Sequence, residues 1–325
     1  MKKKLKSIKI FVAGHRGMVG TSFINYIKKK EFGKIITVNR NILNLENEKQ
    51  VDSFIKIKKP DIIVNCAGKV GGILANSTYP TEFLNENISI QMNIIKAAYN
   101  NNIQHLLNLG SSCIYPKEAK QPIKVEYLLS SKLEKTNEAY ALAKIVGLKM
   151  CDFYNQQYKT SYLTIMPCNL YGPNDNFDSK NSHFIPALIK KFVNSKNKSV
   201  KVEIWGTGKP KREVMHVDDL ASAIYFIIKK KLLNNKSLLN YLKKTSILNV
   251  GSSKEYSIKQ LANIINKITN SNSKLMFNKK YPDGTMRKIL DNSSIKKLGW
   301  KPKLKLNKGL SQTINWYKKN YLGIN

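Results

Sequence analysis

The chain has 325 residues and a formal net charge of +35, with 56 Lys and Arg against 21 Asp and Glu. This length can bury a substantial core and favours two lobes, and no apolar run approaches the length of a membrane span. The 4 cysteines lie far apart without a CxxC pair, which argues against a disulfide framework or a metal site. We therefore expect a cytoplasmic protein with no signal peptide and no membrane association.

The basic charge could attract nucleic acid or another polyanion. The lysines are scattered, however, with no run longer than three and no arginine-rich arm. We interpret the charge as a basic surface that attracts anions in general, and we expect no specific nucleic-acid partner. A polyanion-binding protein that keeps an enzyme fold stays open as an alternative.

Short apolar runs alternate with helical patterns through the first half of the chain. This alternation indicates βαβ units and predicts an α/β fold with a doubly wound parallel sheet, the Rossmann arrangement. The expected strands are Ile8–Ala13, Ile35–Val38, Asp61–Ala67, His105–Leu109 and Tyr162–Met166, and the expected helices include Met18–Lys30, Thr81–Asn101 and Glu138–Tyr158.

The second half loosens after Leu170 into loops rich in Asn, Gly and Pro, which favours a second, smaller α/β lobe that holds a substrate. His216–Asp219 is expected to open a helix with an aspartate as its N-cap, and Ile247–Val250 is expected to form another strand. Ser257–Gln260 matches a capping box. We expect a cofactor-binding domain over 1–170, rejoined by about 214–250, and a mainly substrate-binding domain over 171–325.

A glycine-rich turn, GHRGMVG, follows the first expected strand and opens the first expected helix. Glycines permit the tight turn and the close approach of a pyrophosphate, whose charge is favoured at a helix N-terminus. The spacing is GxxGxxG and predicts a dinucleotide site that comprises Gly14, His15, Arg16, Gly17, Met18, Val19 and Gly20.

The second expected strand ends near where the adenosine ribose of a bound dinucleotide lies. A carboxylate there would suit the 2′-hydroxyl of NAD, but the sequence supplies Asn39 and Arg40. A guanidinium suits a 2′-phosphate, and Arg16 could add a second positive contact. We therefore predict NADP(H) in preference to NAD(H).

Tyr140 and Lys144 are four residues apart in a strongly helical segment and should share one helix face. An ammonium near a phenol favours the phenolate, so we predict that Lys144 lowers the pKa of Tyr140. Ser111 follows the fourth expected strand and could hydrogen-bond the same substrate oxygen. The three residues together predict proton transfer to and from a substrate oxygen.

These motifs identify a wider resemblance, which extends over nearly the whole chain. The sequence resembles the extended short-chain dehydrogenases, and within them the branch that converts GDP-4-keto-6-deoxy-mannose to GDP-fucose. The resemblance implies a two-lobed NADPH enzyme that epimerises two carbons, reduces a ketone and forms a homodimer. It is carried by GHRGMVG (14–20), KVGGILAN (69–76), GSSCIYPKEAKQP (110–122), NEAYALAKIVGLKMC (137–151), NLYGPNDNF (169–177), NSHFIPALIKKF (181–192), WGTGKPKREVMHVDD (205–219) and YPDGTMRKILD (281–291).

The resemblance also assigns site residues by position. It implies Cys113 as the base and His183 as the acid of the epimerisation, beside Ser111, Tyr140 and Lys144. The implied contacts to the GDP-sugar are Lys191, Trp205, Arg212 and Asp283, with lysine at position 191 where arginine is expected and Arg287 as a further phosphate partner. The further implied cofactor contacts are Arg40, Asn41, Leu109, Gly110, Ser111, Ser112, Lys144, Pro167, Cys168, Asn169, Leu170 and His183.

A nucleotide-sugar 4,6-dehydratase or 4-epimerase with the same scaffold is the main alternative. A dehydratase is expected to carry an Asp-Glu pair directly after the strand-end Ser or Thr. This chain has Ser112 and Cys113 there, which disfavours that alternative.

Overall fold

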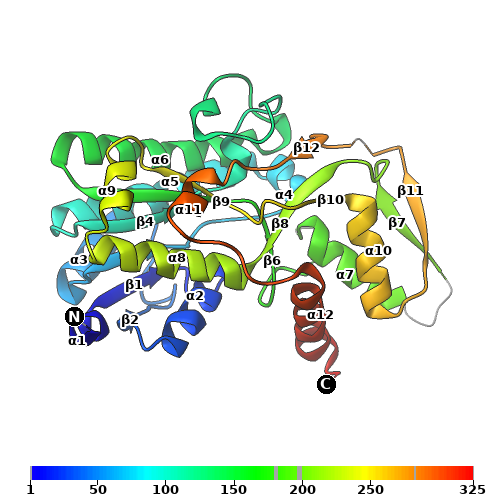
Figure 1. The fold of residues 1–325 in the computed structure, drawn as a ribbon, viewed down its shortest axis with the longest axis horizontal. Coiled ribbons are helices and arrows are strands. Elements are labelled where there is room, and N and C mark those ends of the chain that lie inside the picture. The colour runs from blue at the N-terminus through cyan, green and yellow to red at the C-terminus, as the bar shows by residue number, and fades with distance from the viewer. Residues whose placement is uncertain (1, 179–181, 196–199, 282, 325) are drawn as a thin grey trace.

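A central sheet of six parallel strands organises the first part of the protein in the computed structural model, which describes residues 2–178, 182–195, 200–281 and 283–324 (Figure 1). The strand order is β2-β1-β3-β4-β5-β9, so the predicted doubly wound Rossmann sheet is confirmed. Asn181 and Pro282, which belong to motifs quoted above, lie outside the described residues. The strands are β1 (Lys9–Ala13), β2 (Lys34–Ile36), β3 (Ile62–Asn65), β4 (His105–Leu109), β5 (Ser161–Pro167) and β9 (Ile247–Val250).

Helices cover both faces of this sheet, because successive side chains of its buried strands point to opposite sides. Ile10 and Val12 of β1 share a core with α2 (Met18–Lys29) and α8 (Val217–Leu232). Phe11 and Ala13 of the same strand pack instead with α3 (Glu48–Lys58) and α5 (Pro80–Asn100). α6 (Glu138–Tyr158) lies beside α5.

The chain leaves the sheet after β5, forms a second assembly and returns for β9. In that assembly β8 (Lys211–His216) pairs with β6 (Asn169–Tyr171), β10 (Glu255–Ser257) and β12 (Arg287–Lys288). β7 (Lys201–Trp205) pairs separately with β11 (Lys274–Asn278). Three helices complete this smaller α/β unit around a core of its own, as Figure 1 shows at the right: α7 (Phe184–Ser195), α10 (Ile258–Thr269) and α12 (Leu306–Leu322).

Short elements connect the larger ones. They are α1 (Lys2–Ser7), α4 (Ile73–Thr78), α9 (Lys236–Leu242), α11 (Ser293–Lys297) and the 3-10 turns η1 (Ser112–Ile114), η2 (Val125–Tyr127) and η3 (Lys135–Asn137). Among the described residues, no helix is both long and apolar enough to cross a bilayer.

The helix ends test two sequence predictions. The capping box at Ser257 and Gln260 is confirmed, since each side chain accepts a backbone N–H of the other residue. The aspartate N-cap predicted for α8 is wrong. His216 caps that helix, and its Nδ1 accepts the amide of Asp218 at 3.2 Å, while Asp219 accepts amides from the segment that precedes α12. Burial lowers the pKa of His216 and so favours the neutral, accepting ring.

Candidate functional site

The glycine turn after β1 is shaped by close backbone approaches. Gly14 has φ +75°, and a Cβ on it would lie 2.6 Å from the amide nitrogen of Ala67. A Cβ on Gly20 would lie 2.3 Å from the carbonyl oxygen of Gly14. Gly17 is different, because a Cβ there would meet only that carbonyl oxygen, at 3.5 Å. Gly17 also caps α2 without a side-chain hydrogen bond, so the first amides of the helix can bind an anion.

The residues predicted to contact an adenosine 2′-phosphate lie on an open surface. β2 ends at Ile36, two residues earlier than predicted, so Arg40 and Asn41 lie in the loop that follows it. The Arg40 side chain is 80% exposed and forms a 3.0 Å ion pair with Glu46. Arg16 is also exposed. The loop therefore presents a guanidinium that is accessible but already paired.

Ser111, Tyr140 and Lys144 meet where β4 ends and α6 begins. The Ser111 hydroxyl accepts the amide of Cys113 at 3.4 Å and lies near enough to the Tyr140 phenol to act on its pKa. The Lys144 Nζ donates to the carbonyl of Leu109 at 3.0 Å and lies 5.8 Å from the centre of the Tyr140 ring. The predicted shared helix face is confirmed by this contact.

The predicted pKa shift of Tyr140 is wrong in direction. Burial raises the pKa of the phenol, the nearby Cys113 raises it further, and only the Ser111 hydrogen bond acts against them. Lys144 is 4% exposed, and burial lowers its pKa to about 8. Desolvation therefore dominates both groups, and Tyr140 remains a proton donor across the neutral range.

Cys113 lies in η1, directly after Ser111, and is 8% exposed. Burial raises the pKa of the thiol, while the charge of Lys288, the Ser111 hydrogen bond and the charge of Lys144 act to lower it, in that order. The structure thus brings Cys113, Ser111, Tyr140 and Lys144 together.

His183 immediately precedes α7, and its carbonyl accepts the amide of Ala187. Its side chain is exposed at the surface of the chain. The surrounding protein still lowers the pKa of the ring, which favours neutral imidazole. Within the part of the chain that the structure describes, His183 is not among the groups that shift the pKa of Cys113.

The four residues assigned to the GDP-sugar gather around β7, β8 and the segment before β12. The Lys191 Nζ donates to the Glu203 carbonyl at 2.8 Å and lies 5.8 Å from the Trp205 ring centre. Asp283 accepts the amide and the hydroxyl of Thr207 at 2.8 and 2.6 Å. Arg212 donates to the carbonyl of Thr285, and Asp283 raises its pKa against the effect of burial.

Two aromatic rings and one ion pair complete this region. Trp205 is 53% exposed and stacks on Tyr281 with ring centres 4.2 Å apart and an angle of 13°. Arg287, a candidate phosphate partner, instead donates to Glu255 at 2.8 Å. Tyr281 was given no role in the sequence analysis, although it opens the quoted motif YPDGTMRKILD two residues before Asp283, a signal that could have found it.

The remaining predicted cofactor contacts lie at the ends of β4 and β5. A Cβ on Gly110 would lie 2.4 Å from the sulfur of Met166, so a larger residue there would displace the end of that side chain. Leu109, Ser112, Pro167, Cys168, Asn169 and Leu170 follow the same sheet edge. Below this edge, Asn65, Asn108 and Gln91 form a buried hydrogen-bonded chain that sequence reasoning missed.

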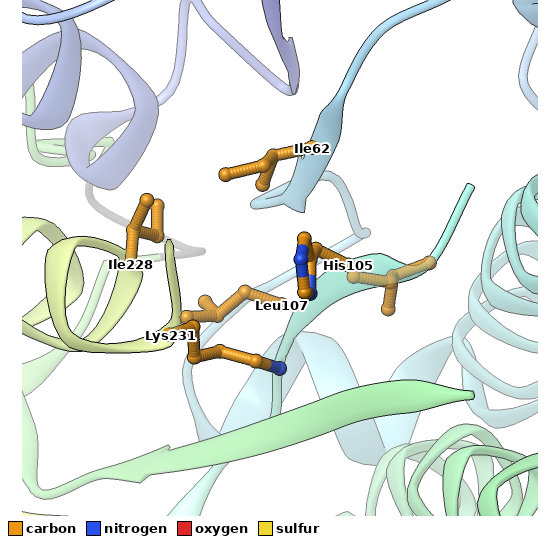
Figure 2. A pocket seen from close by; sticks show the side chains of 6 residues that line it. Ile62, His105, Leu107, Ile228 and Lys231 are labelled. Carbon is orange, nitrogen blue, oxygen red and sulfur yellow. The ribbon is translucent and has the colours of Figure 1, made fainter. Parts of the chain in front are cut away.

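A separate small cavity, shown in Figure 2, lies at the amino ends of β3 and β4, whereas the site lies at the carboxyl ends of the strands. It is lined by His105 at the start of β4 and by Lys231 of α8, with apolar side chains around them. It belongs to the core and not to the site, because the glycine turn and Tyr140 lie at the other ends of the strands.

A glycine turn with an uncapped helix, placed beside a Tyr-Lys pair at the carboxyl edge of a doubly wound sheet, defines a dinucleotide-dependent enzyme. Residues 10–260 match the NAD dependent epimerase/dehydratase family, and the chain belongs to it.

Named relatives extend the match over nearly the full length. GDP-L-fucose synthase 1 of Arabidopsis thaliana is 46% identical and is matched over 97% of this chain and 94% of its own. GDP-L-fucose synthase of Escherichia coli (strain K12) is 42% identical, over 96% and 97%. A GDP-mannoheptose C4 reductase from Campylobacter jejuni, solved with NADP bound, superposes with a TM-score of 0.86 at 34% identity and covers 96% of this chain and 99% of its own.

Proposed function

We propose that this chain is a GDP-L-fucose synthase that epimerises C3 and C5 of GDP-4-keto-6-deoxy-D-mannose and then reduces its C4 ketone with NADP(H). The observation that carries the proposal is the presence of the Cys113 thiol within the Ser111, Tyr140 and Lys144 cluster. Relatives named GDP-L-fucose synthase, at 46% and 42% identity over nearly the whole chain, support it.

The epimerisation needs a base for a carbon-bound proton and donors for the resulting enolate. The ketone acidifies the C–H bonds at C3 and C5, because the electron pair left behind is delocalised onto the C4 oxygen. Cys113 removes the proton as a thiolate, and Ser111 and Tyr140 donate hydrogen bonds to the enolate oxygen. The raised pKa of Tyr140 suits this role, since only the protonated phenol donates. His183 is assigned the opposite face, where it returns a proton to carbon.

The reduction uses the same oxygen. NADPH supplies the hydride that reaches C4. Tyr140 then gives its proton to the C4 alkoxide, and Lys144, which lies 5.8 Å from the Tyr140 ring centre, would orient the phenol and hold the nicotinamide ribose. The glycine turn from Gly14 to Gly20 fits the pyrophosphate, because it combines an uncapped helix start with space at Gly17.

The sugar nucleotide is assigned to the smaller unit. Lys191 and Arg212 supply cations for the diphosphate, and the half-exposed Trp205, stacked on Tyr281, supplies aromatic surface for the base. Asp283 holds the loop that follows Trp205. We assign residues 1–170, with about 214–250, to NADP(H) and 171–325 mainly to the GDP-sugar.

We also propose a homodimer formed through α5 and α6. Leu142, Val146 and Phe153 are exposed at spacings that share one face of α6, and the exposed Tyr99 of α5 packs against Tyr158 at the end of α6. Surfaces of this kind mark interfaces in soluble proteins.

All 4 cysteines are unpaired, which supports a reducing, cytoplasmic location.

The test is solvent exchange measured beside cofactor oxidation. Protein, GDP-4-keto-6-deoxy-D-mannose and NADPH are incubated in D₂O, and deuterium at C3 and C5 is followed by NMR. Cys113→Ser should slow exchange about 100-fold or more while some NADPH oxidation persists, whereas Tyr140→Phe should impair reduction most. Exchange at the wild-type rate in Cys113→Ser would exclude the thiol as the base.

The same experiment decides the second candidate function. The 34% identity to a GDP-mannoheptose C4 reductase favours a reductase without epimerase activity as that candidate. Such an enzyme would oxidise NADPH without placing deuterium at C3 or C5 in the unmodified protein.

A further inference from the structure

We propose that Lys288 is the positioning residue that stabilises the thiolate of Cys113 and so makes it a base. This inference rests on the proposed function for the role of Cys113 in epimerisation. Lys288 comes from β12 of the smaller unit, whereas Cys113 comes from the end of β4 in the large sheet. The base and its activator thus belong to different parts of the fold.

The two residues line one small cavity. Its wall also includes Lys117, Glu134 and Thr285. Cys113 is almost fully buried there, so its charge cannot be stabilised by bulk water and must be balanced by a nearby group.

Backbone hydrogen bonds fix where Lys288 lies relative to the Cys113 segment. The Ile123 amide donates to the Ile289 carbonyl at 2.8 Å, and the Asp291 amide donates to the Ile123 carbonyl at 2.8 Å. The side chain of Gln121 accepts the Ile289 amide at 2.9 Å. The residues that follow Lys288 are therefore joined to the loop that follows Cys113.

A buried carboxylate anchors the same segment from below. Glu213 of β8 accepts the Leu290 amide at 2.9 Å and the side-chain amide of Asn292 at 2.9 Å. The pairing of β12 with β8 places Lys288 opposite Arg212. The backbone that carries Lys288 is therefore fixed relative to β8.

The charges around the pair favour a thiolate next to an ammonium. Lys288 is influenced by Cys113, Arg212 and Glu134, and its pKa is lowered by burial first and by Arg212 in addition. Glu134, which also pairs with Lys117 at 3.5 Å, raises the pKa of Lys288 as well, but less than Cys113 does. An anion at Cys113 is therefore the larger of the two influences that offset the burial and the repulsion from Arg212.

The other groups near Cys113 lower the pKa of its thiol less than Lys288 does, or do not lower it. Of the influences that favour the thiolate, Lys288 comes first, before the Ser111 hydrogen bond and Lys144. A thiolate at Cys113 would raise the pKa of Tyr140 and keep that phenol protonated. Lys288 thus lowers the pKa of the Cys113 thiol without lowering the pKa of the Tyr140 phenol.

The test is the pH profile of Cys113 alkylation by iodoacetamide, which needs neither substrate nor cofactor. It is done in a Cys66→Ala background, since Cys66 is more exposed than Cys113 and would also be alkylated. Loss of labelling in Cys113→Ser assigns the signal. Lys288→Met should raise the apparent pKa by roughly one unit or more and slow alkylation at neutral pH about tenfold, while Lys288→Arg should stay near the parent.

Lys117→Met is the matched control, because Lys117 lines the same cavity but pairs with Glu134. It should leave the alkylation profile unchanged. An equal shift in Lys117→Met would overturn the proposal and indicate a general charge effect. An unchanged profile in Lys288→Met, with a higher KM for the GDP-sugar, would also overturn it and leave Lys288 a substrate-binding residue. Lys288→Gln repeats the measurement if the Met variant does not fold.

The proposed function can fail separately. Absence of deuterium exchange at C3 and C5 in the unmodified protein would refute epimerisation, even where Lys288 still sets the alkylation profile.

Discussion

Lys231 carries a testable stability cost that is independent of the chemistry. It lines the cavity in Figure 2, is 4% exposed, and donates to the carbonyl of Ser161. Burial lowers its pKa to about 7, and the nearby Cys151 opposes that effect only in part. His105 also lines the cavity, and its pKa is lowered to about 4, so at neutral pH its ring is uncharged and cannot balance the charge of Lys231.

The size of the effect follows from linkage. The pKa falls from 10.5 in the unfolded chain to about 7 in the folded one. Protonated Lys231 therefore destabilises the folded protein. The full penalty applies below pH 7, and it decreases as the pH rises from 7 toward 10.5. At about 1.36 kcal/mol per unit, the penalty is up to about 5 kcal/mol at low pH, and roughly 2 kcal/mol is recovered between pH 7 and 9.

The assay is urea unfolding at pH 7, 8 and 9. Lys231→Met removes the buried charge but also a hydrogen bond worth about 1 kcal/mol, so it should be at least as stable as the parent at pH 7. Between pH 7 and 9 the free energy of unfolding of the parent should rise by roughly 2 kcal/mol more than that of Lys231→Met. Lys229→Met, on the exposed side of the same helix, should follow the parent. Parallel curves for Lys231→Met and the parent would refute the reasoning.

Three further predictions address the cofactor and the assembly. Arg40→Asp should weaken the binding of NADPH at least about tenfold more than the binding of NADH. Glu46→Gln should strengthen NADPH binding a few-fold, because it frees the Arg40 guanidinium from its ion pair. Equal losses of affinity for both cofactors in titrations of Arg40→Asp would refute a role for Arg40. Gly20→Ala should lower stability by about 1–3 kcal/mol in thermal melts, because its Cβ meets backbone, whereas Gly17→Ala should keep the melting temperature and mainly lose NADP affinity. Phe153→Glu should shift light scattering from dimer to monomer, and an unchanged mass would reject the α5–α6 interface.

The fold could be predicted because its signals are local. Apolar strands and helices of the first half were placed within a few residues, since buried parallel strands are short apolar runs and α6 carries a long helical pattern. The end of β2 was misplaced because Thr37 and Val38 continue the apolar pattern beyond the last paired residue. The N-cap of α8 was misassigned because His216 is an unusual cap, and an Asp residue was the better choice from preference alone.

The site was predicted less completely, because burial and partners are not local properties. Tyr140 and Lys144 were correctly paired, yet the sign of the tyrosine shift depends on how deeply both are buried. Lys288 could not be selected from 56 Lys and Arg residues without the strand pairing that places it opposite Arg212. Glu46 likewise shows its pairing with Arg40 only in three dimensions.

The two proposed chemistries require opposite proton affinities from neighbouring groups. Reduction and enolate stabilisation need a phenol that holds its proton until an alkoxide forms, and burial raises the pKa of Tyr140 as this requires. Epimerisation needs a thiol that loses its proton, although the same burial raises the pKa of Cys113. A single cation between the two would shift both in the same direction. In this fold Lys144 instead donates to the Leu109 carbonyl, and Lys288 reaches the thiol from a different strand. The pKa of Tyr140 and the pKa of Cys113 can therefore be adjusted separately.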